Sequence, residues 1–350
     1  MNEFKTTYPD NNYTVHVGHE IFNEVMERYT SEYNDVFYIV DETVYANFKD
    51  GQLHGIEDPI LIDSGESSKS FDSFINLTER LLEKGIKRSS LIVVIGGGAA
   101  GDAGGFASAV TLRGVDFIQV PTTILAHDSA IGGKTAINSV HGKNLIGAFH
   151  RPVGVVYDLE FLNTLPKSEI LSGYGEVFKH ALLNSEDAVH KLMRQTSEGL
   201  SIEAIEESII DGIKTKMKYV SQDEFESGSR KFLNLGHTLG HAIEYRYKIP
   251  HGHAIILGLY AMMYISNETA ESNIFDLQKF HEYFSVLEYP VGLLSEMDID
   301  EMIGLMRHDK KNTRNEAIGF VLVNESFSPY FTELNINALE NYLSGIKESI

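Results

Sequence analysis

The chain has 350 residues, of which 29 are Lys or Arg and 50 are Asp or Glu, so its formal net charge is −21 with the histidines neutral. Most of such a surface repels phosphate backbones, which excludes nucleic acid as a partner. The hydrophobic share of 43% and the length indicate a globular protein of about two domains.

The sequence contains no cysteine, so no disulfide can form, and any metal must be bound by His and carboxylate side chains. The first residues are polar and charged where a secretory signal would be apolar, which predicts a cytoplasmic protein. Apolar stretches such as 254–265 are shorter than the ~20 residues of a membrane-spanning helix, so no membrane span is expected.

The first part of the chain alternates short apolar runs with helical patterns. Residues 36–40 and 60–62 are apolar and bounded by polar turn residues, which predicts buried strands. Apolar residues recur at helical spacing over 71–84, before Gly85, and another strand-like run covers 91–95. This rhythm predicts an α/β fold with a mostly parallel sheet covered by helices.

Beyond residue 165 the pattern becomes mainly helical. Long amphipathic helices are expected over residues 175–194, 202–220, 233–247 and 254–272. We place the domain boundary where a strand-like run ends before Pro166, giving domains 1–160 and 161–350. Because no Gly/Ser linker separates them, we expect tight packing and a ligand site in a cleft.

A glycine-rich turn follows the strand predicted over 91–95. Gly96, Gly98 and Gly101 match G-x-G-x-x-G between a strand and an alanine-rich helix, which predicts a Rossmann-like domain that binds a dinucleotide. A tight turn that binds nothing fits the same pattern. Asp102 would repel a pyrophosphate at the helix start, so we expect it to accept from a hydroxyl or a backbone N–H. Asp41, at the end of an earlier strand, is the candidate for binding the ribose.

Residues 120–152 are too polar and too rich in glycine for a core helix. Lysines 134 and 143 and Arg151 stand there against a single acid, Asp128. We therefore expect a loop that binds phosphate or carboxylate, with a solvated surface loop as the alternative.

Histidines gather late in the sequence. His237 and His241 are spaced i and i+4, and His251 and His253 follow closely, which indicates a site for a divalent metal rather than satisfied core histidines. Thr238 occupies the position of the general base in a zinc protease, which argues against peptide hydrolysis.

The carboxylate for such a site is expected from another predicted helix. Glu176 lies within one helical turn of Lys179 and His180. One carboxylate and two imidazoles with an open position make a catalytic metal site. Together with a dinucleotide and several cations, it suits oxidation of an alcohol on an anionic, phosphorylated substrate.

Five segments in this order resemble the 3-dehydroquinate synthase family of sugar phosphate cyclases. They are GGGxxGD, PTT...DSxxGGKT...GKNxxGAF, GxxEVxKHAL, RKFLNLGHTxGHA and the late DKK. The resemblance covers nearly the whole chain and implies a dehydroquinate synthase-like fold, with an N-terminal Rossmann-like parallel-sheet domain and a C-terminal mainly α-helical domain. It also implies a homodimer.

The resemblance implies one divalent metal, Zn²⁺ or Co²⁺, bound by Glu176, His237 and His251, while His253 stands where the family usually has Glu. It implies NAD contacts at Asp41, Ser64, Gly65, Glu66, Ser67, Ser68, Lys69, Gly97, Gly98, Ala99, Ala100, Gly101, Asp102, Thr122, Thr123, Lys134, Lys143, Phe161, Leu162, Asn163 and Thr164. It implies catalytic or substrate contacts at Arg113, Asp128, Lys134, Asn144, Lys179, Lys216, Arg230, Asn234, His241 and Lys310.

The implied reaction is the second step of the shikimate pathway, which leads to chorismate and the aromatic amino acids. A lyase of this family converts 3-deoxy-D-arabino-heptulosonate 7-phosphate to 3-dehydroquinate and phosphate, by transient oxidation with NAD, phosphate elimination, reduction and aldol cyclisation. The alternatives are another sugar phosphate cyclase, such as a 2-deoxy-scyllo-inosose or valiolone-type synthase, a polyol-phosphate dehydrogenase, or an NAD-binding regulator without activity. Lys179, Arg230 and Lys310 together favour a carboxylated substrate.

Overall fold

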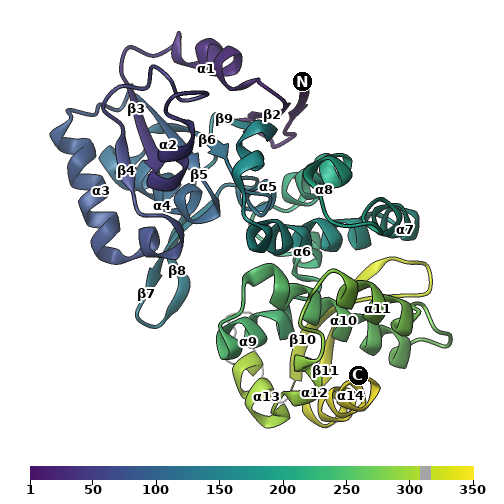
Figure 1. Ribbon diagram of the computed structural model, residues 1–350. Coiled ribbons are helices and arrows are strands. Elements are labelled where there is room, and N and C mark those ends of the chain that lie inside the picture. The colour runs from purple at the N-terminus through teal and green to yellow at the C-terminus, as the bar shows by residue number, and fades with distance from the viewer. Residues whose placement is uncertain (308–316) are drawn as a thin grey trace. The chain divides into compact units, whose positions relative to one another are not determined.

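The computed structural model describes residues 1–307 and 317–350 (Figure 1). The chain forms two compact units. The first comprises Met1–Glu169 and Lys216–Ser221, and the second comprises Ile170–Thr215 and Gln222–Ile350. Lys310, an expected substrate contact, lies outside the described residues.

The first unit is built on a seven-stranded sheet with the strand order β1-β2-β9-β6-β5-β3-β4. Its strands are β1 (Asn2–Lys5), β2 (Thr14–Gly18), β3 (Val36–Asp41), β4 (Ile60–Ile62), β5 (Leu91–Gly96), β6 (Asp116–Pro121) and β9 (Gly154–Asp158). Strand β1 pairs antiparallel with β2, and the other neighbouring strands in the described sheet pair parallel. The predicted parallel α/β sheet is confirmed.

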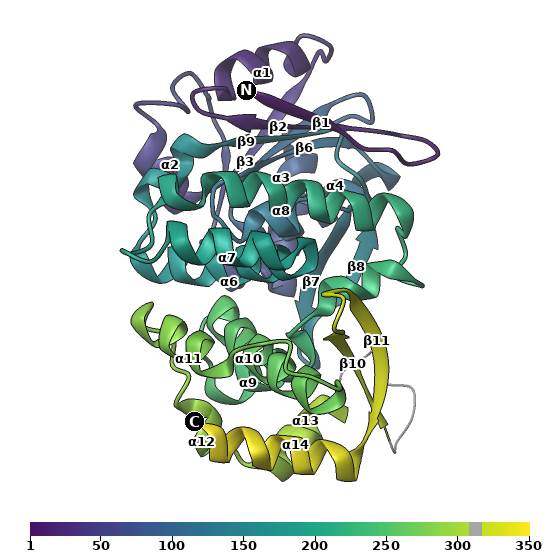
Figure 2. The same ribbon diagram turned by 90° about the vertical axis from the view of Figure 1, so that its right-hand side faces the viewer.

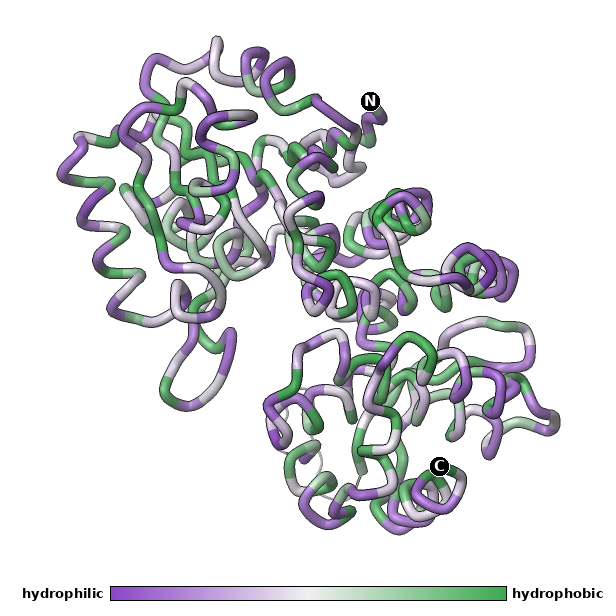
Figure 3. Tube along the Cα trace, in the orientation of Figure 1, coloured by the Kyte–Doolittle hydropathy of each residue, from purple (hydrophilic) through white to green (hydrophobic). Residues whose placement is uncertain are grey.

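Helices cover both faces of this sheet. Alternate side chains of β5 point to opposite faces, so Val93 joins one core cluster and Val94 joins the other. The first cluster includes residues of α1 (Phe22–Thr30) and α2 (Glu42–Phe48), and the second includes residues of α3 (Phe71–Glu83) and α4 (Gly98–Val110). In Figure 3 the strands of the sheet are largely green, and α3, at the left edge, alternates green and purple. A sheet buried on both faces explains why its strands are continuous apolar runs.

The segment 120–152 is a β-hairpin in large part, so the prediction of a loop was wrong. After the short α5 (Ala126–Ser129), strands β7 (Lys134–Ser139) and β8 (Gly142–Phe149) pair antiparallel. Only Thr135 and Ile137 of β7 are fully buried, and β8 is exposed along nearly its whole length. The hairpin therefore lacks the apolar alternation by which strands are recognised in a sequence.

The second unit is mainly helical, as expected. Its helices are α6 (Lys167–Asn184), α7 (Glu186–Gln195), α8 (Ile202–Gln222), α9 (His237–Tyr247), α10 (His251–Thr269), α11 (Leu277–Val286), α12 (Leu293–Glu296), α13 (Ile299–Arg307) and α14 (Ile336–Ser349). Of these, the start of α6 and residues 216–221 of α8 belong to the first unit. A hairpin that the sequence reading missed, β10 (Ala317–Val323) with β11 (Pro329–Asn335), packs against α10 and α14 (Figure 2).

The helix predicted over 175–194 is two helices. Ser185 adopts an extended backbone conformation, and its hydroxyl accepts from the N–H of Ala188 at 3.1 Å. It thereby ends α6 and caps the start of α7. Four short 3₁₀ helices complete the described elements: η1 (Gly65–Lys69), η2 (Thr111–Arg113), η3 (Leu159–Thr164) and η4 (Ser229–Asn234).

Helix α10 forms the core of the second unit and touches its neighbours backbone to backbone. It is buried along most of its length. A Cβ added at Gly252 would lie 1.7 Å from the carbonyl oxygen of Ser172 in α6, and one at Gly258 would lie 1.9 Å from that of Gly236, beside α9. Backbones can approach this closely only where the residue is glycine, because any side chain would clash.

We predict that Gly252→Ala strongly destabilises the protein, because the new methyl group must displace the backbone of α6. A loss at or above the upper end of the ~1–3 kcal/mol of core overpacking is expected. The matched control is Gly304→Ala in α13, where an added Cβ meets nothing within 4 Å. Urea unfolding measures the stability of both variants. Equal unfolding midpoints would contradict the close contact at Gly252.

Candidate active site

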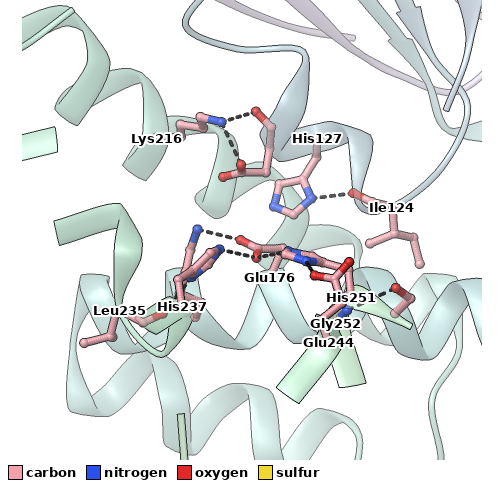
Figure 4. A network of polar contacts seen from close by, with 12 residues as sticks. Ile124, His127, Glu176, Lys216, Leu235, His237, Glu244, His251 and Gly252 are labelled. Atoms are coloured by element: carbon pink, nitrogen blue, oxygen red, sulfur yellow. Dashed lines mark hydrogen bonds and ion pairs between the residues drawn. The ribbon is translucent and has the colours of Figure 1, made fainter. Parts of the chain in front are cut away.

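Three side chains of the second unit converge on one point (Figure 4). The Nε2 atoms of His237 and His251 lie 3.2 and 3.3 Å from Oε1 of Glu176. One ligand atom from each residue lies within 4.8 Å of the others. Two imidazole nitrogens and a carboxylate oxygen are a donor set that suits Zn²⁺ or Co²⁺ and leaves positions open for substrate.

The position of each of these residues follows from the glycine contacts of α10. Glu176 follows Gly175 in α6, and a Cβ at Gly175 would lie 2.4 Å from the carbonyl oxygen of Gly252. His251 precedes Gly252 at the start of α10. His237 follows Gly236, whose positive φ of 76° sets the entry into α9. The closest backbone contacts of the unit therefore stand next to its three candidate ligands.

The surroundings of Glu176 and His237 favour the protonation states in which these side chains bind a metal ion. Burial alone would raise the pKa of Glu176, but the Lys179 ammonium, 2.5 Å from Oε2, and the nearby His237 hold it well below its usual range. Burial lowers the pKa of His237 to about 4. An ionised carboxylate and a neutral imidazole are the forms in which these groups bind metals.

His251 differs from His237 because it contacts two carboxylates. Burial would lower the pKa of His251, but hydrogen bonds to Glu176 and Glu244 raise it to about 9. Without a metal, His251 therefore carries a positive charge between Glu176 and Glu244, and Nε2 must lose its proton before it can bind a metal.

The other two histidines of the predicted cluster have different surroundings. The His241 ring lies 5.1 Å from that of His237 and 5.9 Å from that of His251, between ring centroids, which places His241 beside the three candidate ligands. His253 packs against Tyr289 at 5.2 Å, and burial lowers its pKa.

Two expected substrate contacts precede α9 on η4. Arg230 is 2% exposed, and its guanidinium donates to the carbonyl oxygen of Glu224. Asn234 donates to Oε1 of Glu226 at 2.7 Å. The sequence reading missed Glu226, because a single acid in a polar loop carries no pattern.

In the first unit the glycine-rich turn joins β5 to α4, with Gly97 at the N-cap. A Cβ at Gly98 would lie 2.9 Å from the hydroxyl of Ser129, so the turn is tightly packed whether or not it binds a ligand. Asp41 ends β3 and caps α2, where its carboxylate accepts from the N–H of Thr43 at 2.9 Å and from the hydroxyl of Ser64 at 2.6 Å. Its predicted contact with ribose would be added to this structural role.

A buried lysine connects three parts of the first unit. Lys69 of η1 is 2% exposed and donates to Oδ2 of Asp102 in α4 at 2.6 Å and to Oδ1 of Asn144 in the β7–β8 hairpin. Burial raises the pKa of Asp102 despite this ion pair. Glu66, in the same 3₁₀ helix, accepts from Asn138 of the hairpin at 2.6 Å. Four predicted ligand-binding residues, Glu66, Lys69, Asp102 and Asn144, thus lie in one hydrogen-bonded neighbourhood.

Other candidates of the first unit have different surroundings. Lys216, from the part of α8 that belongs to this unit, donates to Oδ2 of Asp128 at 2.7 Å and to the Asp128 carbonyl oxygen. Arg113 has a positive φ of 69° at the end of η2. Phe161 and Leu162 are each 1% exposed and belong to the core, whereas the adjacent Asn163 and Thr164 are exposed.

No helix in the described part of the chain combines the length and the apolar character that crossing a bilayer requires.

Two family models match adjoining parts of the chain. The model described as 3-dehydroquinate synthase N-terminal matches residues 59–172, and the one described as 3-dehydroquinate synthase C-terminal matches residues 173–312. A 3-dehydroquinate synthase of Staphylococcus haemolyticus is 48% identical over 334 residues, which cover 93% of this chain and 94% of that protein.

Solved structures share the fold over nearly the whole chain. The structure of a 2-deoxy-scyllo-inosose synthase complexed with carbaglucose-6-phosphate, NAD⁺ and Co²⁺ has a TM-score of 0.82 at 25% identity, covering 98% of this chain and 99% of its own. That of 2-epi-5-epi-valiolone synthase from Streptomyces hygroscopicus, with NAD⁺ and Zn²⁺ bound, also has a TM-score of 0.82, at 21% identity and 97% coverage of both chains.

We predict that His251→Ala abolishes metal binding while His253→Ala preserves it, because of these two histidines only His251 directs a ring nitrogen at Glu176. The loss in His251→Ala should exceed the ~10–100-fold typical of residues that only support a ligand. Elemental analysis after dialysis measures bound metal. Equal metal content in the two variants would count against the assignment.

Proposed function

The chain belongs to the 3-dehydroquinate synthase family, and we propose on this basis that it converts 3-deoxy-D-arabino-heptulosonate 7-phosphate to 3-dehydroquinate and phosphate. The observation that carries the proposal is the convergence of Glu176, His237 and His251 in a chain that both family models match. The pathway, the lyase class and the homodimer are proposed from the family resemblance, and the cytoplasmic location from the polar first residues of the sequence.

The proposed cofactors are NAD and one Zn²⁺ or Co²⁺ ion. The donor set of two imidazoles and one carboxylate supports the metal. The strand, glycine turn and helix of β5 and α4 support the dinucleotide, as does the complex of the related cyclase with NAD⁺ and Co²⁺. When bound, NAD would accept and return a hydride, and the metal would polarise the substrate oxygen that loses its proton.

The side chains of the second unit supply charge and orientation. Glu176 and the two histidines would hold the metal, and Lys179 fixes the Glu176 carboxylate. Arg230 holds a positive charge in a nearly buried position, which suits a substrate that carries phosphate and carboxylate groups. His241 lies beside the candidate ligands, where its imidazole would accept and return protons.

The first unit is proposed to bind the cofactor and to contribute further cations. Lys69 is held by Asp102 and Lys216 by Asp128, so both ammonium groups are fixed in position. In a chain of net charge −21, such cations at motif positions would counter the repulsion of an anionic substrate.

One assay tests the reaction against its rivals. Protein loaded with metal and catalytic amounts of NAD is mixed with the heptulosonate phosphate, and inorganic phosphate and NADH absorbance are followed together. We expect phosphate release without net NADH, because the cofactor is regenerated in each turnover. Sustained NADH formation would indicate a dehydrogenase, and absence of phosphate would contradict the proposal.

A parallel reaction separates the synthase from a cyclase of the 2-deoxy-scyllo-inosose type, whose solved structure holds carbaglucose-6-phosphate. Glucose 6-phosphate, which has no carboxylate, replaces the heptulosonate phosphate under the same conditions. We expect little phosphate release, because Lys179 and Arg230 are proposed to meet a carboxylated substrate. Faster release from the glucose phosphate would favour the rival cyclase.

We predict that Lys69→Met weakens NAD binding at least tenfold, because Met keeps the apolar stem and removes the cation that joins Asp102 to Asn144. Breaking this buried pair should also cost about 3–5 kcal/mol of folding free energy. The control is Lys87→Met, which removes a lysine 66% exposed and paired with Asp35 on the surface. Calorimetric titration with NAD measures the affinity, and urea unfolding measures the stability. A loss of stability with unchanged affinity would restrict Lys69 to a structural role.

A further inference from the structure

One ring nitrogen of His251 contacts a carboxylate that the proposed function does not use. Nδ1 of His251 lies 2.8 Å from Oε2 of Glu244, while Nε2 faces Glu176 (Figure 4). Glu244 is on α9, seven residues after His237, so the two side chains lie on nearly the same face of that helix. The Glu244 side chain is 17% exposed and therefore largely shielded from water.

His237 shows the same arrangement with a different acceptor. Its Nδ1 lies 3.0 Å from the carbonyl oxygen of Leu235, and its Nε2 faces Glu176. A neutral imidazole carries one N–H, so donation from Nδ1 leaves the lone pair on Nε2. In the neutral form, which is the form that binds a metal, the two hydrogen bonds thus select for each ring the tautomer that presents Nε2 to the position of a metal.

His251 needs such a partner more than His237 does. Its side chain is 27% exposed, against 13% for His237, and it is the first residue of α10, preceded by Pro250. A ring at the exposed start of a helix is free to turn unless another group holds it. Glu244 supplies that group from the neighbouring helix.

We propose that Glu244 is a positioning residue, which accepts the Nδ1–H of His251 and thereby fixes the orientation and tautomer of this ring for metal binding. The inference rests on the metal centre of the proposed function. A carboxylate in this place also makes the imidazole a stronger ligand, because it stabilises positive charge that develops on the ring.

Three variants test the role of Glu244. Glu244→Ala removes the acceptor, and Glu244→Gln keeps an oxygen at the same distance along the side chain without the charge. Glu268→Gln is the control, because it makes the same change at an exposed site near the end of α10. Affinity is measured by competition with a chelator for Zn²⁺, and the geometry of the site by the visible spectrum of the Co²⁺-loaded protein.

We expect about 10–100-fold weaker metal binding and an altered Co²⁺ spectrum in Glu244→Ala. Partial rescue is expected in Glu244→Gln, and no change in Glu268→Gln. Thermal unfolding of the metal-free variants shows whether the folds are intact. An intact Glu244→Ala fold with weakened metal binding supports positioning of His251.

Wild-type affinity and spectrum in Glu244→Ala would overturn the inference while leaving the metal centre in place. Equal loss in the Ala and Gln variants with an unchanged Co²⁺ spectrum would also overturn it, because the geometry would then not depend on the hydrogen bond. Failure of the unmodified protein to bind either metal would instead overturn the proposed function, and this inference with it.

Discussion

The second unit depends on the close approach of α10 to α6 and to the start of α9. A carbonyl oxygen lies where any side chain on Gly252 or Gly258 would have to be. These contacts leave the helices little room to slide, since a shift of one residue would set a side chain against a backbone. Glu176, His237 and His251 each adjoin a glycine of these contacts. The precision that a metal site requires is therefore provided by the packing of the core.

Buried charge is the second constraint on the molecule. Lys69, Lys179 and Lys216 are almost fully buried, and each is paired with a carboxylate. Removing such ions from water is costly, and hydrophobic side chains of similar volume would stabilise a core at least as well. Their presence fits the proposed binding of an anionic substrate and cofactor better than a role in stability alone. The chain as a whole contains 50 acidic and 29 basic residues, so buried lysines stand out against its negative net charge.

The sequence predicted what depends on local pattern and missed what depends on contacts between distant residues. Strand β5 and the turn at Gly97 follow from a buried apolar run that ends in glycines, and both were found. The histidines were recognised as a group, but their spacing alone left open which of them face Glu176, and family resemblance made that choice. The β7–β8 hairpin was missed because it is mostly exposed. Glu244 was missed because an acid on a helix has no signature until the chain brings His251 beside it.

Residues 216–221 of α8 determine how this protein can be divided into fragments. They belong to the first unit, although the chain on both sides of them belongs to the second. A fragment that stops at Glu169 would keep the sheet and the glycine turn, yet its Asp128 would lose the ammonium group of Lys216. The first unit is thus discontinuous in sequence, and the chain cannot be separated into two self-sufficient pieces by a single cut. An exchange of modules between relatives would have to carry this stretch of α8 along with the N-terminal half.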